Sequence, residues 1–226
     1  MPLIEVRGVS HRYGERPVLV DVDVDLRERR VGVVGANGSG KSTFARLLNG
    51  LVVPTEGQVR VDGLSTRTEG RAVRRKVGFC FTDPDAQIVM PTVAEDVAFG
   101  LRRRGLSRTE VRARVEATLA AYGLTGHADH PAHLLSGGQK QMLALASVMV
   151  TEPALLVMDE PTTLLDLRNA RSIAAAVAAL EEQVLLVTHH LDLLEGFDRV
   201  LVFDEGRVVC DDLPEVAVRH YRRLMA

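Results

Sequence analysis

Gly-Ala-Asn-Gly-Ser-Gly-Lys-Ser, residues 35–42, is a complete phosphate-loop pattern, G-x-x-x-x-G-K-[ST]. An apolar run at 31–34 precedes it and predicts a strand. Apolar residues at helical spacing between 44 and 51 follow it and predict a helix. Because strand, glycine loop and helix occur in this order, the pattern predicts a phosphate site at a helix N-terminus.

The chemistry of this loop suits a nucleoside triphosphate. Its glycines let successive backbone N–H groups point inward at anionic oxygens. Lys41 is long enough to reach the β- and γ-phosphates, and the Ser42 hydroxyl is suited to bind Mg²⁺. The predicted nucleotide-contacting residues of this segment are Gly35, Asn37, Gly38, Ser39, Gly40, Lys41, Ser42 and Thr43.

Composition narrows the functional classes. The 226 residues are 46% hydrophobic and carry a net charge of −2, which disfavours a dedicated nucleic-acid binder. The two cysteines have no metal or redox spacing, and residues 1–5 show no signal-peptide pattern. The longest apolar stretch, 143–150, is shorter than the ~20 residues that span a bilayer. We therefore expect a cytoplasmic chain that serves a membrane only through a partner.

The order of predicted elements indicates an α/β fold. Val18, Val20, Val22, Val24 and Leu26 alternate with polar residues, which predicts a half-buried strand within a β-rich start at 3–30. A strand at 57–62 ends in the turn Asp62-Gly63. Helical patterns then dominate 87–150, with a capping box at 107–110.

Buried strands return in the last third of the chain. The unbroken apolar runs 155–158 and 184–187 are typical of parallel strands covered on both faces. A helix is predicted between them, and a hairpin is predicted at 200–209. We expect one domain, 1–226, with a nucleotide-binding α/β core at 1–86 and 151–226 and a helical subdomain at 87–150. The core includes an antiparallel β subdomain.

A second chemical signal lies in Ala-Leu-Leu-Val-Met-Asp-Glu-Pro, residues 154–161. An apolar strand delivers carboxylates at its C-terminal end, where open α/β sheets bind their ligands. Asp159 is placed to hold Mg²⁺, directly or through water, and Glu160 to orient the water that attacks the γ-phosphate.

A third signal, Leu135-Ser136-Gly137-Gly138-Gln139, opens a predicted helix. With the glycine loop, the acidic strand and a later histidine in family order, the chain resembles an ATP-binding-cassette (ABC) ATPase over essentially its whole length. The resemblance implies that Ser136, Gly137, Gly138 and Gln139 form the signature that closes over ATP held by a second copy. It thus implies a head-to-tail dimer, with a homodimer favoured, that binds two ATP and Mg²⁺.

Other family positions follow from the resemblance. Tyr13 resembles the aromatic residue that stacks on adenine, with Val18 beside it. Thr163-Leu164-Leu165-Asp166 resembles the D-loop, in which Asp166 would couple the two ATP sites. His189 resembles the switch histidine that hydrogen-bonds the γ-phosphate.

The Q-loop departs from the family pattern, which places a glutamine in Phe-Gln-Asn-Pro. This chain has Phe-Thr-Asp-Pro at 81–84, so that Thr82 replaces the glutamine. A threonine hydroxyl is shorter and would contact Mg²⁺ through water, or Gln87 would serve instead. We favour Thr82 as the metal-contacting residue and Gln87 as a structural one.

Two further features, three histidines and an arginine run, could be functional sites, but we favour a structural interpretation of each. His127, His130 and His133 are spaced by three, as metal ligands sometimes are, but they fall in a polar loop that contains proline. The run Arg102–Arg104 is interpreted as a solvated or helix-capping cluster, with a partner or lipid contact as the alternative.

The segments 83–89 and 92–100 are similar to those of the ATPase subunits of energy-coupling-factor (ECF) importers. That similarity implies a chain at the cytoplasmic face of the membrane. Its partners would be a transmembrane T component and a small substrate-binding membrane protein, with no nucleic acid. Asp83, Asp85, Glu95 and Asp96 would meet arginines of the T component or merely cap helices. Biotin is the favoured cargo, and cobalt or nickel the next. The alternatives are another ABC importer or exporter subunit, or a soluble ABC ATPase acting on nucleic acid or ribosomes.

Overall fold

The computed structural model describes residues 1–102 and 104–226, which form two compact units. The first unit comprises Met1–Phe79, Ala154–Glu160 and Glu181–Ala226. The second comprises Cys80–Pro153 and Pro161–Leu180. The second unit is thus larger than the predicted helical subdomain at 87–150, because it also includes residues 80–86 and 161–180.

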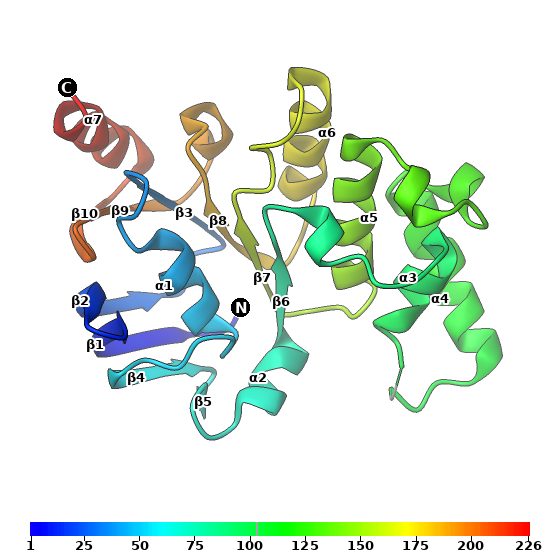
Figure 1. Ribbon diagram of the computed structural model, residues 1–226, viewed down its shortest axis with the longest axis horizontal. Helices are drawn as coiled ribbons and strands as arrows, with labels where there is room; N and C mark the ends of the chain where they lie inside the picture. Colours follow the sequence, from blue (N-terminus) through cyan, green and yellow to red (C-terminus); the bar gives the residue numbers. More distant parts are fainter. Residues whose placement is uncertain (103) are drawn as a thin grey trace. The chain divides into compact units, whose positions relative to one another are not determined.

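Two sheets form the first unit (Figure 1). Among the described residues, the larger sheet has six strands in the order β10-β9-β3-β8-β7-β6. The pairs β3–β8, β3–β9 and β7–β8 are parallel, as predicted from the unbroken apolar runs, and β9–β10 is the predicted hairpin. These strands are β3 (Arg30–Gly35), β6 (Val77–Cys80), β7 (Leu155–Asp159), β8 (Gln183–Val187), β9 (Arg199–Asp204) and β10 (Arg207–Asp212).

The smaller sheet is antiparallel, in the order β2-β1-β4-β5 among the described residues. Its strands are β1 (Ile4–Tyr13), β2 (Arg16–Leu26), β4 (Glu56–Val61) and β5 (Leu64–Ser65). Helix α1 (Lys41–Leu48) contacts strands of both sheets and buries Phe44, Leu47 and Leu48 between them (Figure 1). Helix α2 (Gly70–Lys76), the short η4 (Leu191–Leu194) and helix α7 (Pro214–Leu224) complete this unit.

The predicted alternation of β2 is wrong in its first half. Leu19 is buried, whereas Val18 and Val20 are only partly buried, so the inward face switches before Val22. The register with β1 shifts in this region, and Asp21 has a left-handed φ of 51°. A β-bulge inserts one residue and moves the alternation to the other face, which the spacing of valines alone does not reveal.

Helices dominate the second unit, as the sequence pattern of 87–150 predicts. They are η1 (Pro84–Ala86), α3 (Val93–Phe99), α4 (Arg108–Ala121), η2 (Thr125–His127), η3 (Ala132–Leu134), α5 (Gly137–Met149) and α6 (Leu167–Ala178). A core that includes Val97, Leu119 and Leu143 joins α3, α4 and α5. The capping box of Ser107 and Glu110 begins α4 as predicted.

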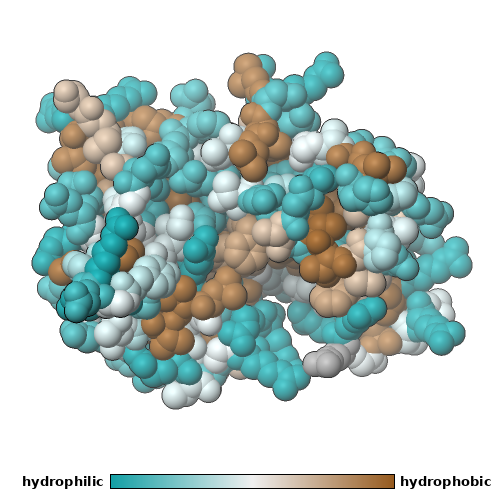
Figure 2. Space-filling model, in the orientation of Figure 1, coloured by the Kyte–Doolittle hydropathy of each residue, from teal (hydrophilic) through white to brown (hydrophobic). Residues whose placement is uncertain are grey.

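Many hydrophilic side chains lie on the face of the molecule that Figure 2 shows. On the face that Figure 2 shows, hydrophobic side chains lie in separate patches among hydrophilic ones. Such scattered apolar side chains are ordinary for a folded domain. Among the described residues, no helix is long and apolar enough to cross a membrane.

Asp96 is a buried acceptor that organises the second unit. Its carboxylate accepts the backbone N–H of Val89 at 2.9 Å and of Met90 at 3.0 Å, and the Ser147 hydroxyl at 2.7 Å. The side chain is 3% exposed. Asp96 therefore ties the segment before α3 to helix α5, and its carboxylate is committed within the fold.

We expect Asp96→Ala to lower the free energy of unfolding by about 2–4 kcal/mol, because three donors lose a buried charged acceptor. Urea denaturation followed by circular dichroism measures this change. Glu116→Ala is the matched control, since Glu116 is an exposed acid on α4 whose ion pair with Arg112, at 2.7 Å, lies at the surface. Equal losses in the two variants would contradict the structural role of Asp96.

Candidate nucleotide site

The phosphate loop lies between β3 and α1 in the first unit, as its sequence predicts. Gly40 precedes the helix with a left-handed φ of 101°. A Cβ at this position would lie 2.6 Å from the Val18 carbonyl oxygen, so only glycine fits here. The loop is thereby packed against β2, which contributes Val18 to the same cavity.

The side chain of Lys41 is buried inside the phosphate loop. Its Nζ donates to the carbonyl oxygens of Gly35 and Ala36, both at 2.8 Å, and the residue is 4% exposed. Burial lowers the pKa of Lys41, and the negative charges of Glu160 and Asp159 oppose that shift. The ammonium group therefore lies where the loop's inward N–H groups would receive a phosphate.

Ser42 and Asp159 meet across the first unit, although they are 117 residues apart in sequence. The Ser42 hydroxyl donates to Asp159 Oδ1 at 2.8 Å, and Arg46 Nη2 lies 3.5 Å from Asp159 Oδ2. Burial raises the pKa of the Asp159 carboxyl, while Ser42 and Arg46 act to lower it.

This donor set fits Mg²⁺. The ion prefers hydroxyl, carboxylate and phosphate oxygens, and it usually takes only one or two ligands from the protein. Thr82, the third predicted metal-contacting residue, belongs to the second unit, and its role stays a prediction.

The described residues hold no group of three His, Cys, Asp or Glu side chains suited to a metal. The loop histidine His127 instead contacts Gln139, with 3.0 Å between the two Nε2 atoms.

Glu160 and His189 come together at the ends of the neighbouring strands β7 and β8. Their Oε1 and Nε2 atoms lie 2.8 Å apart, and the two side chains are 18% and 30% exposed. Glu160 has a left-handed φ of 53°, and its N–H donates to the Val187 carbonyl at 3.0 Å. A left-handed φ is uncommon for a residue other than glycine. A carboxylate and an imidazole so placed can orient and polarise a water molecule.

A cavity of about 280 Å³ within the first unit is lined by both the phosphate loop and Glu160. Tyr13, which is 50% exposed, and Val18 line it together with the loop and Glu160. Its lining residues are Tyr13, Arg16, Val18, Asn37, Gly38, Gly40, Lys41, Ser42, Thr43 and Glu160. The cavity has an aromatic wall, a basic loop and a carboxylate, which suits a base, its phosphates and a hydrolytic water.

Sequence reasoning missed Arg16 and Arg46. Arg16 lines the cavity between Tyr13 and Val18, and Arg46 reaches Asp159 from α1. The signal for Arg46 was present, because it lies one helical turn after Ser42 and therefore on the same face. Arg16 had no comparable signal, since a single arginine in a turn is common.

The signature segment begins α5 in the second unit. Ser136 Oγ accepts the Gln139 N–H at 3.3 Å, and Gln139 Oε1 accepts the Ser136 N–H at 2.9 Å. Asp166 likewise begins α6, where its carboxylate accepts the Asn169 N–H at 2.8 Å. A Cβ on Gly138 would lie 2.2 Å from Asn169 Oδ1, so α5 and α6 approach closely through Asn169. Asn169 therefore bonds Asp166 through its backbone N–H, while its side chain lies beside Gly138 of the signature.

Gln87 is committed within the second unit. Its Oε1 accepts the Phe81 N–H at 3.2 Å, and its Nε2 donates to the Ala144 carbonyl at 2.8 Å. These bonds tie the segment around Thr82 to helix α5, which supports the structural interpretation of Gln87.

The acidic residues Asp83, Asp85, Glu95 and Asp96 all make bonds within the second unit. Asp83 caps η1 through the Asp85 N–H at 3.0 Å, and Glu95 completes a capping box with Thr92. Asp85 pairs with Lys140 at 2.7 Å.

In the basic run 102–104, the Arg102 guanidinium lies 4.9 Å from the centre of the Phe99 ring. Arg103 lies outside the described residues.

Residues 19–163 match the protein-family model described as ABC transporter. The chain belongs to the ABC transporter ATPases. It is an ATPase that binds ATP and couples its hydrolysis to transport. The fold prediction is thereby confirmed.

Relatives agree with this assignment. The biotin transport ATP-binding protein BioM of Rhizobium etli is 48% identical over 222 residues, 98% of each chain. The energy-coupling factor transporter ATP-binding protein EcfA1 of Symbiobacterium thermophilum is 43% identical over 241 residues, 100% of this chain and 84% of EcfA1. The structure of CbiO1 from Clostridium perfringens, part of the ABC transporter complex CbiONQ, matches with a TM-score of 0.85 and 31% identity. That match covers 98% of this chain and 93% of CbiO1.

We expect Glu160→Gln to reduce steady-state ATP hydrolysis by about 100-fold or more while ATP affinity is retained, because only the carboxylate activates water. Phosphate release and equilibrium nucleotide binding measure the two effects. Glu152→Gln is the matched control, since Glu152 is an exposed glutamate with a similar left-handed φ of 51°. Unchanged hydrolysis in Glu160→Gln would remove Glu160 from the reaction.

Two variants, Thr82→Val and Gln87→Leu, test which of the two Q-loop residues contacts Mg²⁺. We expect Thr82→Val to raise the Mg²⁺ concentration needed for half-maximal hydrolysis several-fold, because the hydroxyl is lost at constant shape. Gln87→Leu should leave that concentration unchanged and lower the free energy of unfolding by about 1–3 kcal/mol, since two partly buried hydrogen bonds are lost. The reverse pattern would assign the metal contact to Gln87.

Proposed function

We propose that the chain is the ATP-hydrolysing motor of an ECF-type importer. The placement of Glu160 and His189 beside the phosphate loop carries the hydrolytic part of this proposal. The transport part is supported by the names of BioM and EcfA1, and by the similarity of 83–89 and 92–100 to ECF subunits.

In the proposed reaction, Lys41 and the loop N–H groups bind the β- and γ-phosphates, and Tyr13 and Val18 receive the base. Ser42 and Asp159 would hold Mg²⁺, with Thr82 contacting it through water; the ion neutralises charge on the phosphate oxygens when bound. Glu160 orients a water whose oxygen attacks the γ-phosphorus as the bond to the bridging oxygen breaks and ADP leaves. His189 holds the γ-phosphate and the attacking water in line. Catalysis of this kind depends mainly on positioning and electrostatics.

Two copies would act together, head to tail. Ser136, Gly137, Gly138 and Gln139 of one copy would cover the γ-phosphate bound to the other, and Asp166 would couple the two sites. Asn169 supports this proposal, because it places the signature and Asp166 in one packed arrangement. We favour a homodimer, since this chain carries each of these segments itself.

The membrane partners would be a T component and a small substrate-binding protein at the cytoplasmic face. The second unit offers a groove of about 590 Å³ between α3 and α4, with apolar lining residues that include Ala98, Val111 and Leu119. We place the T component in this groove, because α3 lies in the segment 92–100 that resembles ECF subunits. The carboxylate of Asp96, on the same helix, already accepts hydrogen bonds within the fold, so it is less suited to pair with an arginine of the T component. The cargo we propose is biotin, with a transition-metal ion as the second candidate.

The test is purification of the tagged chain from its native membrane in mild detergent. We expect two copies of the chain with one T component and one small membrane protein, whose bound ligand identifies the cargo. Native mass spectrometry measures the stoichiometry. A large two-domain permease would indicate another ABC transporter, and ribosomes or nucleic acid would indicate a soluble ABC ATPase.

A matched pair of variants tests the groove. Ala98→Glu places a charge in the groove, whereas Ala113→Glu makes the same change at an exposed site on α4 that does not line it. We expect only Ala98→Glu to lose the T component, because burying a charge at an interface is costly. Basal ATP hydrolysis should persist in both. Co-purification that survives Ala98→Glu would place the T component elsewhere.

A further inference from the structure

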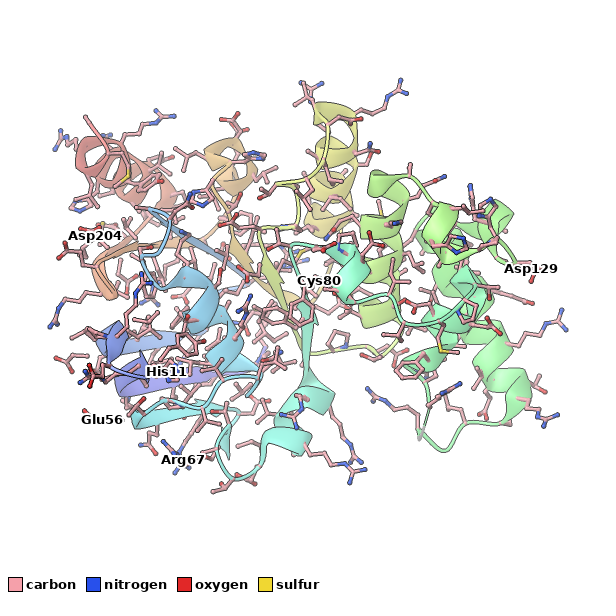
Figure 3. The ribbon with its side chains drawn as sticks, in the orientation of Figure 1. His11, Glu56, Arg67, Cys80, Asp129 and Asp204 are labelled. Atoms are coloured by element: carbon pink, nitrogen blue, oxygen red, sulfur yellow. The ribbon has the colours of Figure 1, made fainter. Side chains whose placement is uncertain are left out.

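His11 lies next to the aromatic wall of the nucleotide cavity without lining it. It is a residue of β1, two positions before Tyr13, and it is 8% exposed. Figure 3 labels it among the strands of the smaller sheet. The rings of His11 and Tyr13 have centroids 4.7 Å apart and planes at 85°, an edge-to-face contact.

The other side of His11 faces the segment that follows α1. Its Nδ1 lies 3.5 Å from Thr55 Oγ1, and the same Thr55 oxygen accepts the Arg12 N–H at 3.2 Å. His11 therefore lies between Tyr13 and a segment that is joined to β1 by the hydrogen bond from the Arg12 N–H to the Thr55 hydroxyl. Burial lowers the pKa of His11, which the backbone of Val53 opposes only partly, so the ring is neutral at neutral pH.

Tyr13 needs such support. It is 50% exposed at the end of a strand, and an exposed aromatic side chain loses rotamer freedom when a ligand stacks on it. A contact that fixes the ring beforehand reduces this cost and raises affinity. Because His11 meets Tyr13 edge to face, it occupies at most one face of the tyrosine ring, and a face remains for a base.

A role in core packing alone explains His11 less well than a role in supporting Tyr13. The strand neighbour Val9 is fully buried with an aliphatic side chain, whereas His11 carries two ring nitrogens into a buried position. Its Nδ1 makes only a 3.5 Å contact with Thr55, and its Nε2 makes no hydrogen bond of ordinary geometry among the described residues, so that the backbone of Val53 interacts with the ring only weakly. Burying polar atoms that are weakly bonded is unfavourable, which argues against a role in core packing alone.

We propose that His11 is a positioning residue for nucleobase binding, which fixes the ring of Tyr13 in the orientation that receives the base. This inference rests on the proposed role of Tyr13. It concerns only the base end of the nucleotide, because His11 does not line the cavity around Lys41 and Glu160.

The experiment compares two probes, ATP–Mg²⁺ and inorganic tripolyphosphate–Mg²⁺, which shares the phosphate chain and lacks the base. His11→Ala should weaken ATP binding about 2- to 10-fold, the range of an aromatic pair, and leave tripolyphosphate binding unchanged. His11→Phe keeps a ring and should retain most of the ATP affinity. Val9→Ala, a truncation on the same strand, should change neither affinity. Isothermal titration calorimetry measures binding, and thermal melting checks that each variant is folded.

Tyr13→Ala and the double variant His11→Ala/Tyr13→Ala complete the test. We expect Tyr13→Ala to weaken ATP but not tripolyphosphate binding, with no further loss when His11→Ala is added. If Tyr13→Ala leaves ATP affinity unchanged, the proposed role of Tyr13 fails. If Tyr13→Ala weakens ATP binding while His11→Ala does not, or weakens both probes equally, the inference about His11 alone is overturned.

Discussion

The nucleotide site depends on the parallel pairing of β7, β8 and β3. Parallel neighbours end at the same edge of a sheet, so the residues that follow them meet in space. Gly35 ends β3, Asp159 ends β7, and His189 follows β8 by two residues. Backbone hydrogen bonds between these strands therefore bring the phosphate loop to the same edge of the sheet as Asp159, Glu160 and His189.

The electrostatics of this edge follow from burial. Lys41 and Asp159 are 4% and 1% exposed, and isolation from water disfavours the charged form of each. Each is stabilised by neighbours: loop carbonyls for the ammonium, and Ser42 with Arg46 for the carboxylate. Such a set of buried polar groups is positioned in advance, so little reorganisation is required when the phosphate charge changes during hydrolysis.

The second unit uses its polar residues differently. Asp96, Gln87 and Asn169 each connect two segments, so the regions around Thr82, α3, α5 and α6 are cross-linked by side chains. Asp96 is buried, whereas Gln87 and Asn169 are partly buried.

The sequence by itself determined the local pieces: the phosphate loop between strand and helix, the capping boxes at Ser107 and Ser136, and the acidic end of β7. These depend on contacts within a few residues, where spacing and residue type are sufficient. Tertiary structure alone decided that Ser42 meets Asp159, that Asp96 is buried, and that His11 supports Tyr13. It also decided the bulge at Asp21, which moved Leu19 inward against the predicted alternation. The physical reason is that strand order, register and burial arise from segments far apart in the chain, and no local pattern records which of them become neighbours.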